Sequence, residues 1–216
     1  NVQGILEDKH KQSLAFIISS LQSIGYSIKY ELLNAADYKI PQDRFRVFFV
    51  GIRNDLQNTF VFPNAMPGKK VTLREAIGDI IEKPRFFNEE RVMSEHSTRK
   101  NHDVYTGSYD AKYMARNRVR SWNEQSFTIQ AQARNEPQHP QAPKMTYVNP
   151  NVRIFAKGYE HLYRRLSVRE CARIQTFPDS FVFFYTDIKD GYKMVGNAVP
   201  PRLAYALAVQ VRKALL

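Results

Sequence analysis

One segment, IPQDRFRVFFVGIR at residues 40–53, limits the possible fold of this chain more than any other. It places Gln42, Arg44 and Arg46 two residues apart, so an extended backbone would project these long side chains from one face. The nearly continuous apolar run at residues 47–52 is typical of a strand buried on both faces. Two arginines at the start of such a strand can donate paired hydrogen bonds to a phosphate or to the edge of a base. A solvated, charged sheet edge beside a core strand is the other interpretation of this segment alone.

The segments before and within this region predict part of an α/β unit. An amphipathic helix is predicted over residues 7–24, and Gly25 stands where a glycine would end it. The apolar face of this helix comprises Leu14, Ile17, Ile18 and Leu21. Residues 26–33 alternate as a strand, and residues 46–52 give a second one. A helix followed by a strand pair matches the closing part of an α/β sheet.

From about Asn54 the pattern becomes irregular. Thr72 and Glu75 have the spacing of a capping box for a short helix to Ile81. Residues 84–150 are rich in Asn, Gln, Ser, Thr and Arg, with short apolar pieces between them. This composition predicts an irregular, mostly β recognition region whose loops carry function.

Helical order returns near the C-terminus. Ser167 and Glu170 form a second capping box, and the helix that follows is expected to stop at residues 177–178. Two prolines at residues 200–201 are expected to open the last helix, since proline suits a first helical turn. The apolar stripe of this last helix comprises Leu203, Leu207, Val211 and Leu215.

The charge balance indicates a polyanionic partner, because the formal net charge is +11 and the sequence pI is about 9.7. Nucleic acid is favoured over a membrane surface, since no basic amphipathic helix carries the charge. No apolar run approaches the roughly 18 residues that span a bilayer, and no signal-peptide pattern opens the chain. We therefore expect a soluble cytoplasmic protein without a membrane partner.

Cysteine and histidine usage argues against disulfides and metal sites. The single cysteine, Cys171, excludes a disulfide framework and fits a reducing compartment. It lies on the apolar side of a predicted helix, so we interpret it as a small buried hydrophobic residue and not as a nucleophile. The five histidines are scattered along the chain, so no metal site is predicted.

Three motif blocks occur in order along the chain. They are QDRFR at residues 42–46, SVRECARIQTFPDSF at residues 167–181 and GYKMVGNAVPP at residues 191–201. Together they resemble the last three motif blocks of the DNA cytosine-C5 methyltransferases, and Asn1-Val2 resembles the end of that family's Glu-Asn-Val triplet. The resemblance implies methyl transfer from S-adenosylmethionine to a cytosine that is flipped out of the duplex.

The resemblance assigns roles to residues of the first and third blocks. Arg46 matches the arginine that contacts O2 of the target cytosine, where a donor stabilises developing charge. Arg44 matches the other arginine of that block and is taken as a second catalytic residue, and Gln42 would brace a loop or bind a DNA phosphate. Asn197 matches the asparagine beside the cofactor. Ala198 replaces a serine of many relatives, so it would contact the cofactor only through its backbone.

Structural roles are the alternatives for these residues. Arg46 could pair with a carboxylate at the sheet edge, and Asn197 could be a turn or helix-cap residue. Arg169 and Glu170 of the second block are expected to organise the joint between domains without touching substrate.

The candidates for DNA contact are Arg116, Arg118, Arg120 and Arg134. The first three are two residues apart, as on one face of a strand, and arginine makes bidentate contacts with guanine O6 and N7. The surrounding sequence resembles the recognition region of bacterial methylases that act on GGCC. That resemblance implies that Arg116, Arg118 and Arg134 read guanines, and phosphate contact is the alternative for each.

Other motifs of the family are absent from this sequence. They are the Pro-Cys nucleophile, the Gly-rich cofactor loop and the glutamate before Asn1, which an N-terminal portion would have to supply. We therefore predict an α/β chain that holds the C-terminal part of a Rossmann-like, S-adenosylmethionine-dependent domain at residues 1–55 and 186–216. A smaller, mostly β or irregular target-recognition domain is expected at residues 56–185.

The expected function is target recognition, cytosine O2 contact and part of the cofactor pocket in a bacterial restriction–modification methylase. The chain alone is expected to be inactive, whether it is a natural split subunit, a fragment or the ordered part of a longer protein. A non-catalytic DNA-binding remnant is the alternative, against which the retention of Arg46 and Asn197 argues. A relative that modifies tRNA is disfavoured by the arginine-rich insert before Ser167.

Overall fold

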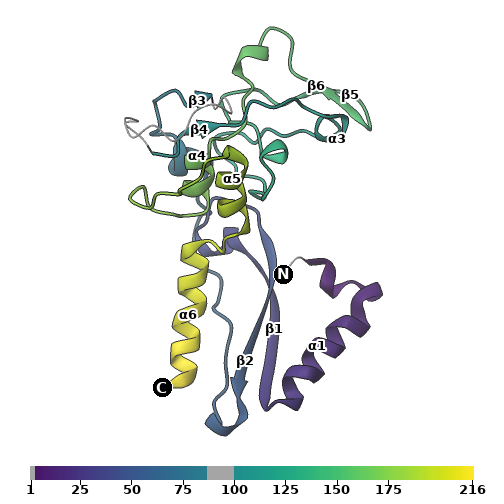
Figure 1. The fold of residues 1–216 in the computed structure, drawn as a ribbon, viewed down its shortest axis with the longest axis vertical. Helices are drawn as coiled ribbons and strands as arrows, with labels where there is room; N and C mark the ends of the chain where they lie inside the picture. Colours follow the sequence, from purple (N-terminus) through teal and green to yellow (C-terminus); the bar gives the residue numbers. More distant parts are fainter. Residues whose placement is uncertain (1–2, 87–99) are drawn as a thin grey trace.

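The computed structural model describes residues 3–86 and 100–216, which form a lower and an upper body (Figure 1). Asn1 and Val2, matched above to the Glu-Asn-Val triplet, lie outside the described residues. We define the lower body as residues 3–62 and 198–216, and the upper body as residues 71–86 and 100–197. Within the described residues, no helix combines the length and the apolar character that a membrane span requires.

The lower body is built on one antiparallel hairpin between two helices (Figure 1). Its main elements are α1 (Lys11–Ser23), β1 (Tyr26–Asn34), β2 (Phe45–Arg53) and α6 (Pro201–Leu215), with short 3-10 helices at Gln3–Leu6, Asp8–His10, Ala35–Tyr38 and Asn54–Leu56. The hairpin register runs from Tyr26 opposite Arg53 to Asn34 opposite Phe45. Both predicted strands are confirmed. The predicted helix is present, but it begins at Lys11 and not at residue 7, because residues 8–10 form a 3-10 turn, and Gly25 follows its end with a φ of 90°.

The prediction that the β2 strand is buried on both faces is wrong for this chain. Val47 and Ile52 are buried, but residues 48–50 are half-buried and Gly51 is exposed. Among the described residues, β1 and β2 have no further strand neighbour, and α1 has no fully buried residue. An open cleft of about 200 Å³ therefore remains beside the hairpin, lined by Leu21, Tyr26, Ile28, Phe49 and Gly51.

The last helix, α6, covers the other face of the hairpin. Leu203 is 1% exposed and packs with Leu33 and Ile40, while Ala214 packs with Ile52 near the far end. The predicted apolar stripe is confirmed at its first three positions. These side chains pack in the two apolar clusters between α6 and the hairpin, around Leu33 and around Ile52: Leu203, Leu207 and Val211. The fourth position differs, because Leu215 is 52% exposed at the end of the helix.

The upper body is mostly irregular, as predicted, but it contains less strand than a mostly β domain. Its elements are α2 (Leu73–Ile77), β3 (Arg85–Phe86), β4 (Asp103–Val104), α3 (Ala111–Met114), β5 (Thr146–Asn149), β6 (Val152–Ile154), α4 (Val168–Ile174) and α5 (Ile188–Asn197), with 3-10 helices at Ala133–Asn135 and Glu160–Leu162. β3 and β4 pair in parallel, and β5 and β6 pair antiparallel. Its main core joins α2, α4 and α5 through residues such as Ile77, Ile174 and Val195.

Both predicted capping boxes are present. The side chain of Thr72 accepts from the Glu75 N–H, that of Ser167 accepts from the Glu170 N–H, and each glutamate accepts from the backbone of its cap residue. Both helices end earlier than expected, at Ile77 instead of Ile81 and at Ile174 before the predicted proline stop.

The expected domain boundary at residues 185–186 does not coincide with a change in packing. Ile188, Tyr192 and Val195 of α5 lie in the same core as α2 and α4, and Figure 1 shows α5 within the upper body. The chain passes to the lower body between α5 and α6, so α5 packs with the rest of the upper body.

We expect Leu203→Ala to destabilise the isolated chain by about 2–5 kcal/mol, because it leaves a cavity between α6 and the hairpin. Leu215→Ala, on the same stripe of the same helix, is the matched control, and it should change stability by less than about 0.5 kcal/mol. Urea unfolding followed by circular dichroism measures both variants. Equal effects would contradict the packing described for α6.

Candidate functional site

The joint between the two bodies is formed by the residues that precede β2. Gln42 is fully buried: its Oε1 accepts from the Ile129 N–H (2.8 Å) and its Nε2 donates to Oε1 of Gln175 (3.2 Å). Gln175 in turn donates to the Val195 carbonyl in α5 (2.7 Å). Of the two roles expected for Gln42, these contacts support bracing of a loop and not contact with a DNA phosphate, because the amide is enclosed and both of its polar ends are used inside the protein.

Arg44 is the central residue of this joint. Its side chain donates from Nη1 to the Ile129 carbonyl (2.8 Å), and from Nη2 to the carbonyls of Gly196 (2.8 Å) and Ala198 (3.3 Å). Burial, together with the neighbouring charge of Arg46, lowers the pKa of Arg44 to about 10, so the guanidinium stays charged at neutral pH. The assignment of Arg44 as catalytic is corrected: it is 4% exposed and positions backbone segments.

The Gly-Asn-Ala block ends α5: Gly196 and Asn197 are the last two residues of this helix, and Ala198 is its C-cap. A Cβ on Gly196 would overlap the carbonyl of Gln130, so α5 can approach the recognition segment this closely only with glycine. Asn197 is exposed, and its carboxamide has no hydrogen-bond partner among the described residues. Ala198 donates its N–H to Val195 (3.2 Å), and its carbonyl accepts from Arg44. The expected backbone contact of Ala198 with a cofactor is therefore not supported, whereas Asn197 is available to a ligand.

Arg46 lies in β2, half-buried, close to Arg44. Its Nη1 donates to the Phe45 carbonyl (2.7 Å), and burial lowers the pKa of its guanidinium. In the described part of the chain no carboxylate pairs with it, so the ion pair considered as an alternative is not found there. Arg46 thus keeps unused donors in a partly desolvated position.

The predicted row of arginines at residues 116–120 does not lie on a regular strand. The segment follows α3, and in the described residues its sheet contact is one isolated bridge between Val119 and Gln138. Arg118 is half-buried and turns back onto α3: its Nε donates to the Tyr113 carbonyl (3.1 Å) and its guanidinium lies 4.6 Å from the Tyr113 ring centre. Its donors are therefore partly used within the protein.

Arg120 belongs to the joint. It forms ion pairs with Asp43 (3.4 Å) and Glu124 (3.2 Å), and its guanidinium lies over the ring of Phe127. Asp43 stands between the two buried joint residues Gln42 and Arg44. A DNA contact by Arg120 would have to compete with both carboxylates, so a structural role is favoured.

Arg116 and Arg134 differ from the other candidates. Both are exposed, and neither guanidinium makes a hydrogen bond or ion pair with a described residue. The backbone carbonyl of Arg134 accepts from Arg165 at 3.2 Å, so its main chain is held while its side chain is available. These two arginines remain the candidates for base contact.

Sequence reasoning missed Arg165, a side chain that holds several loops of the upper body together. It is 1% exposed and donates to the carbonyls of Gly107 (2.7 Å), Ser108 (2.9 Å) and Arg134. Its guanidinium also stacks on three rings, of Tyr105, Tyr109 and Tyr113. The spacing of these tyrosines, four residues apart, was the signal that could have revealed a shared aromatic site.

Comparison with known proteins decides the family. The profile of the C-5 cytosine-specific DNA methylases matches residues 1–213, which is nearly the whole chain. This chain is a member of the C-5 cytosine-specific DNA methylase family. The resemblance of its three motif blocks is thereby confirmed at the level of the family.

Related methylases match the whole chain but are longer. The type II methyltransferase M.MthTI of Methanothermobacter thermautotrophicus is 51% identical, covering 100% of this chain and 65% of its own length. The type II methyltransferase M.FnuDI of Fusobacterium nucleatum is 44% identical, covering 100% and 63%. The chain thus spans less than two thirds of either relative.

A solved structure confirms the fold. A DNA modification methyltransferase encoded within an E. coli prophage superposes with a TM-score of 0.66 at 20% identity, covering 100% of this chain and 68% of that one. The prediction of a Rossmann-like methyltransferase fold is confirmed.

The one cysteine of this methylase chain is structural, as predicted. Cys171 is fully buried in α4, and its thiol lies 3.6 Å from Oε2 of the buried Glu136. Burial raises the pKa of the Cys171 thiol well above its usual range, which disfavours the thiolate that a nucleophile needs. Glu136 also accepts from the Gln130 N–H (2.9 Å), so it holds the recognition segment from inside.

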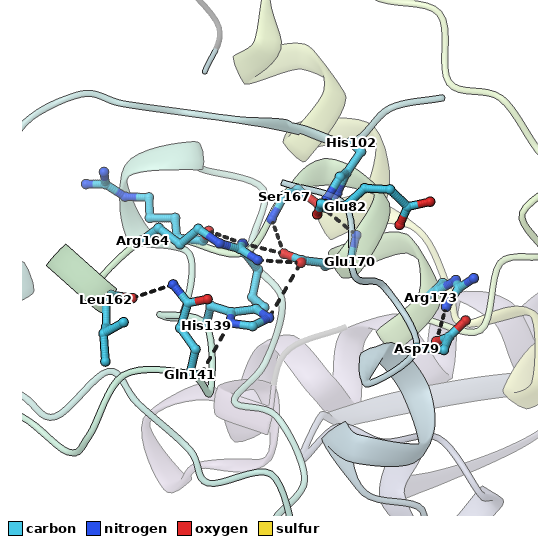
Figure 2. A network of polar contacts seen from close by, with 12 residues as sticks. Asp79, Glu82, His102, His139, Gln141, Leu162, Arg164, Ser167, Glu170 and Arg173 are labelled. Carbon is cyan, nitrogen blue, oxygen red and sulfur yellow. Dashed lines mark hydrogen bonds and ion pairs between the residues drawn. The ribbon is translucent and has the colours of Figure 1, made fainter. Parts of the chain in front are cut away.

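Glu170 lies at the centre of a network of polar contacts with Arg164, Ser167 and His139, as Figure 2 shows. Its carboxylate accepts two hydrogen bonds from Arg164, both 2.7 Å, and one from the Ser167 N–H. Burial alone would raise the pKa of Glu170, but the bidentate Arg164 outweighs it and lowers the pKa to about 2. Glu170 is thus a structural, capping residue as predicted, but its contacts lie within the upper body and not at the joint between domains.

His139 contributes a neutral imidazole to this network (Figure 2). Its Nδ1 accepts from the Gln141 N–H (3.2 Å), so its proton lies on Nε2, which faces Oε1 of Glu170 at 3.6 Å. Burial lowers the pKa of His139 to about 4, even though Glu170 favours the charged form. The imidazole is therefore uncharged at neutral pH.

Arg169 has a structural role, but not at the joint between domains where it was predicted. It is 1% exposed and donates to the Lys100 carbonyl (2.9 Å), to Oδ1 of Asn101 (3.1 Å) and to the Phe181 carbonyl (2.8 Å). These bonds lie within the upper body, so Arg169 joins loops of the recognition region and does not bridge to the lower body.

We expect the stability of the chain to fall as the pH is lowered from about 6.5 to about 4. In that interval the unfolded state binds a proton at His139 that the folded state does not, because the pKa is depressed by burial. The full loss would be on the order of 3 kcal/mol below pH 4, from the difference between the two pKa values. Urea unfolding at a series of pH values measures it.

His139→Asn should flatten this part of the stability profile, since it removes the titrating group. His161→Asn is the matched control, because His161 is exposed and should leave the wild-type profile unchanged. A wild-type slope in the His139 variant would show that another group causes the loss.

Proposed function

We propose that this chain supplies the target-recognition domain and the closing segments of a DNA cytosine-C5 methyltransferase of a bacterial restriction–modification system. Membership of the family over residues 1–213 supports the reaction, and the relatives named as type II methyltransferases support the biological setting. The net charge of +11 suits duplex DNA as the substrate.

The position of Arg46 carries this proposal. Attack on C6 of cytosine places negative charge on the ring, and a preorganised donor at O2 would stabilise it as it develops. Arg46 fits this role because it is half-buried, uses one donor on the Phe45 carbonyl and has no carboxylate partner among the described residues. A low local dielectric strengthens its interaction with an anionic oxygen.

Arg44 and Gln42 act as positioning residues in this proposal. They connect the start of β2 to Ile129 in the recognition region and to the end of α5. The donor on β2, the recognition segment and the Asn197 block are thereby held in one fixed arrangement. Such preorganisation is what a catalytic site needs from its supporting shell.

Asn197 is the residue of this chain that fits a cofactor. S-Adenosylmethionine would supply the methyl group, and its polar groups need hydrogen-bond partners. The exposed Asn197 carboxamide offers both a donor and an acceptor, with no described residue competing for them. Ala198 would add only its methyl group, since its N–H and carbonyl are used within the chain.

Arg116 and Arg134 are proposed to read guanines of a site such as GGCC. Each well-placed bidentate contact contributes about 1–3 kcal/mol of discrimination. Arg118 would have to leave the Tyr113 carbonyl to act in the same way, so its contribution would be smaller. Duplex DNA is favoured because both free arginines project from the same recognition region.

An N-terminal portion with the Pro-Cys nucleophile and the Gly-rich loop is the proposed partner. The half-buried apolar residues 48–50 of β2 are unlike the fully buried central strand that the sequence predicted. Tyr205 on α6 is 72% exposed and Phe16 on α1 is 72% exposed. Apolar surface of this extent is what a missing part of the same sheet would cover.

Methyl transfer from labelled S-adenosylmethionine to a GGCC-containing duplex tests the proposal. The chain alone should be inactive, and a mixture with the N-terminal portion of a close relative should be active. If the chain alone were active, the proposal that the nucleophile lies in the N-terminal portion would be wrong. Salt-sensitive DNA binding without methylation by the mixture would favour a non-catalytic binder.

Arg46→Ala should lower kcat of the reconstituted enzyme about 10²–10³-fold, because one donor to the developing charge is lost. DNA binding should change little, since the contact strengthens in the transition state. Arg53→Ala is the matched control on the same strand, where the side chain is exposed and pairs with Asp55. An undiminished kcat in the Arg46 variant would remove the catalytic role.

A further inference from the structure

The β5–β6 hairpin projects from the upper body on the side where α1 lies below it (Figure 1). It has no core of its own: Tyr147 is 59% exposed, Val148 is 52% exposed and Ile154 is 49% exposed. A short two-stranded hairpin is marginally stable by itself, so its exposed side chains are unexplained by folding. Exposed apolar and aromatic residues grouped on one projection are typical of a binding surface.

The hairpin is nevertheless held firmly at its base. Phe155, directly after β6, stacks on Tyr163 with ring centres 4.2 Å apart, and the Met145 N–H donates to Oδ1 of Asn117 (3.1 Å). Arg153 donates from Nη1 to the Ala115 carbonyl (2.7 Å), so β6 lies beside the residue that precedes Arg116. The hairpin and the candidate base-reading arginine thus form one surface.

Two stretches of sequence that contribute to this surface contain basic residues and no acidic residue. No Asp or Glu occurs from residue 111 to residue 123, or from residue 137 to residue 159. The basic residues in these stretches are Lys112, Arg116, Arg118, Arg120, Lys144, Arg153 and Lys157, of which Arg120 is paired with Asp43 and Glu124 at the joint. Lys144 and Lys157 are exposed, and neither side chain has an ion-pair partner among the described residues. A surface of this kind attracts a polyanion and repels a basic one.

The aromatic residue of the hairpin faces the same way as its arginine. Tyr147 and Arg153 are cross-strand partners, and the guanidinium lies 5.3 Å from the centre of the Tyr147 ring. Arginine, lysine and tyrosine side chains are regular donors to DNA phosphates, whereas base reading needs access to a groove. We propose that the β5–β6 hairpin docks the sugar–phosphate backbone of duplex DNA beside the bases that Arg116 would read. This inference rests on the proposed function and adds a surface to it.

Salt-dependent binding tests the inference, with the complete methylase that contains this chain or the chain reconstituted with its N-terminal portion. The probe is a synthetic duplex without GGCC, because phosphate contacts do not depend on sequence. Lys144→Gln with Lys157→Gln should weaken binding roughly ten-fold and make the slope of log K against log salt shallower by about 2, since each lost phosphate contact removes about 0.9. Thermal unfolding by circular dichroism verifies that the hairpin variant is folded.

Two further variants separate the hairpin from general charge. Lys83→Gln with Lys213→Gln removes the same charge away from the hairpin, at exposed positions before β3 and near the end of α6, and should leave the slope unchanged. Tyr147→Ser removes the ring without changing charge and should weaken binding several-fold at constant slope.

If the Lys144/Lys157 variant binds DNA with unchanged affinity and salt slope, the hairpin does not dock the DNA backbone. The proposed function would still stand in that case, because the wild-type enzyme binds DNA. The inference would also be overturned if the Lys144/Lys157 substitutions changed the oligomeric state and left DNA affinity unchanged. The hairpin would then contact a second copy of the chain. Absence of DNA binding by the wild-type enzyme would instead remove the proposed function, and this inference with it.

Discussion

The buried guanidinium of Arg44 is the interaction on which the arrangement of the two bodies depends. It joins backbone carbonyls that are 85 and 152 residues away in sequence, at Ile129 and Gly196. A charge enclosed in protein is costly unless its hydrogen bonds are made, so the guanidinium can be buried only where these carbonyls converge. The segments that would carry target recognition and cofactor contact are thereby fixed relative to β2.

The same physical solution recurs through the upper body. Its loops form few regular ladders, so many of their carbonyls need donors from side chains. Arg165 and Arg169 supply them: each is 1% exposed and donates to carbonyls of two or more loops. A guanidinium offers five donors in a fixed plane, which suits converging carbonyls better than an ammonium group does. Buried arginines thus satisfy backbone carbonyls that strand pairing would satisfy in a domain built on a sheet.

This use of arginine changes how the net charge of +11 is interpreted. Part of the positive charge is enclosed and serves the fold, and part is neutralised by carboxylates, as at Arg120. The charge available to the proposed DNA partner is concentrated on exposed residues such as Arg116, Arg134 and Lys157. Loss of a buried arginine should therefore unfold loops, whereas loss of an exposed one should alter binding.

The amino-acid sequence by itself determined the features that depend on neighbouring residues. Both capping boxes, the two long strands and the start of α6 follow from local spacing and backbone preference, and the structure confirms them. The family, too, was readable from ordered motif blocks. Only the tertiary structure decided which polar residues of those blocks face water: Gln42 and Arg44 are buried at the joint, while Asn197 is exposed. Periodicity places side chains on a face of a strand, but burial depends on segments that meet from far along the chain.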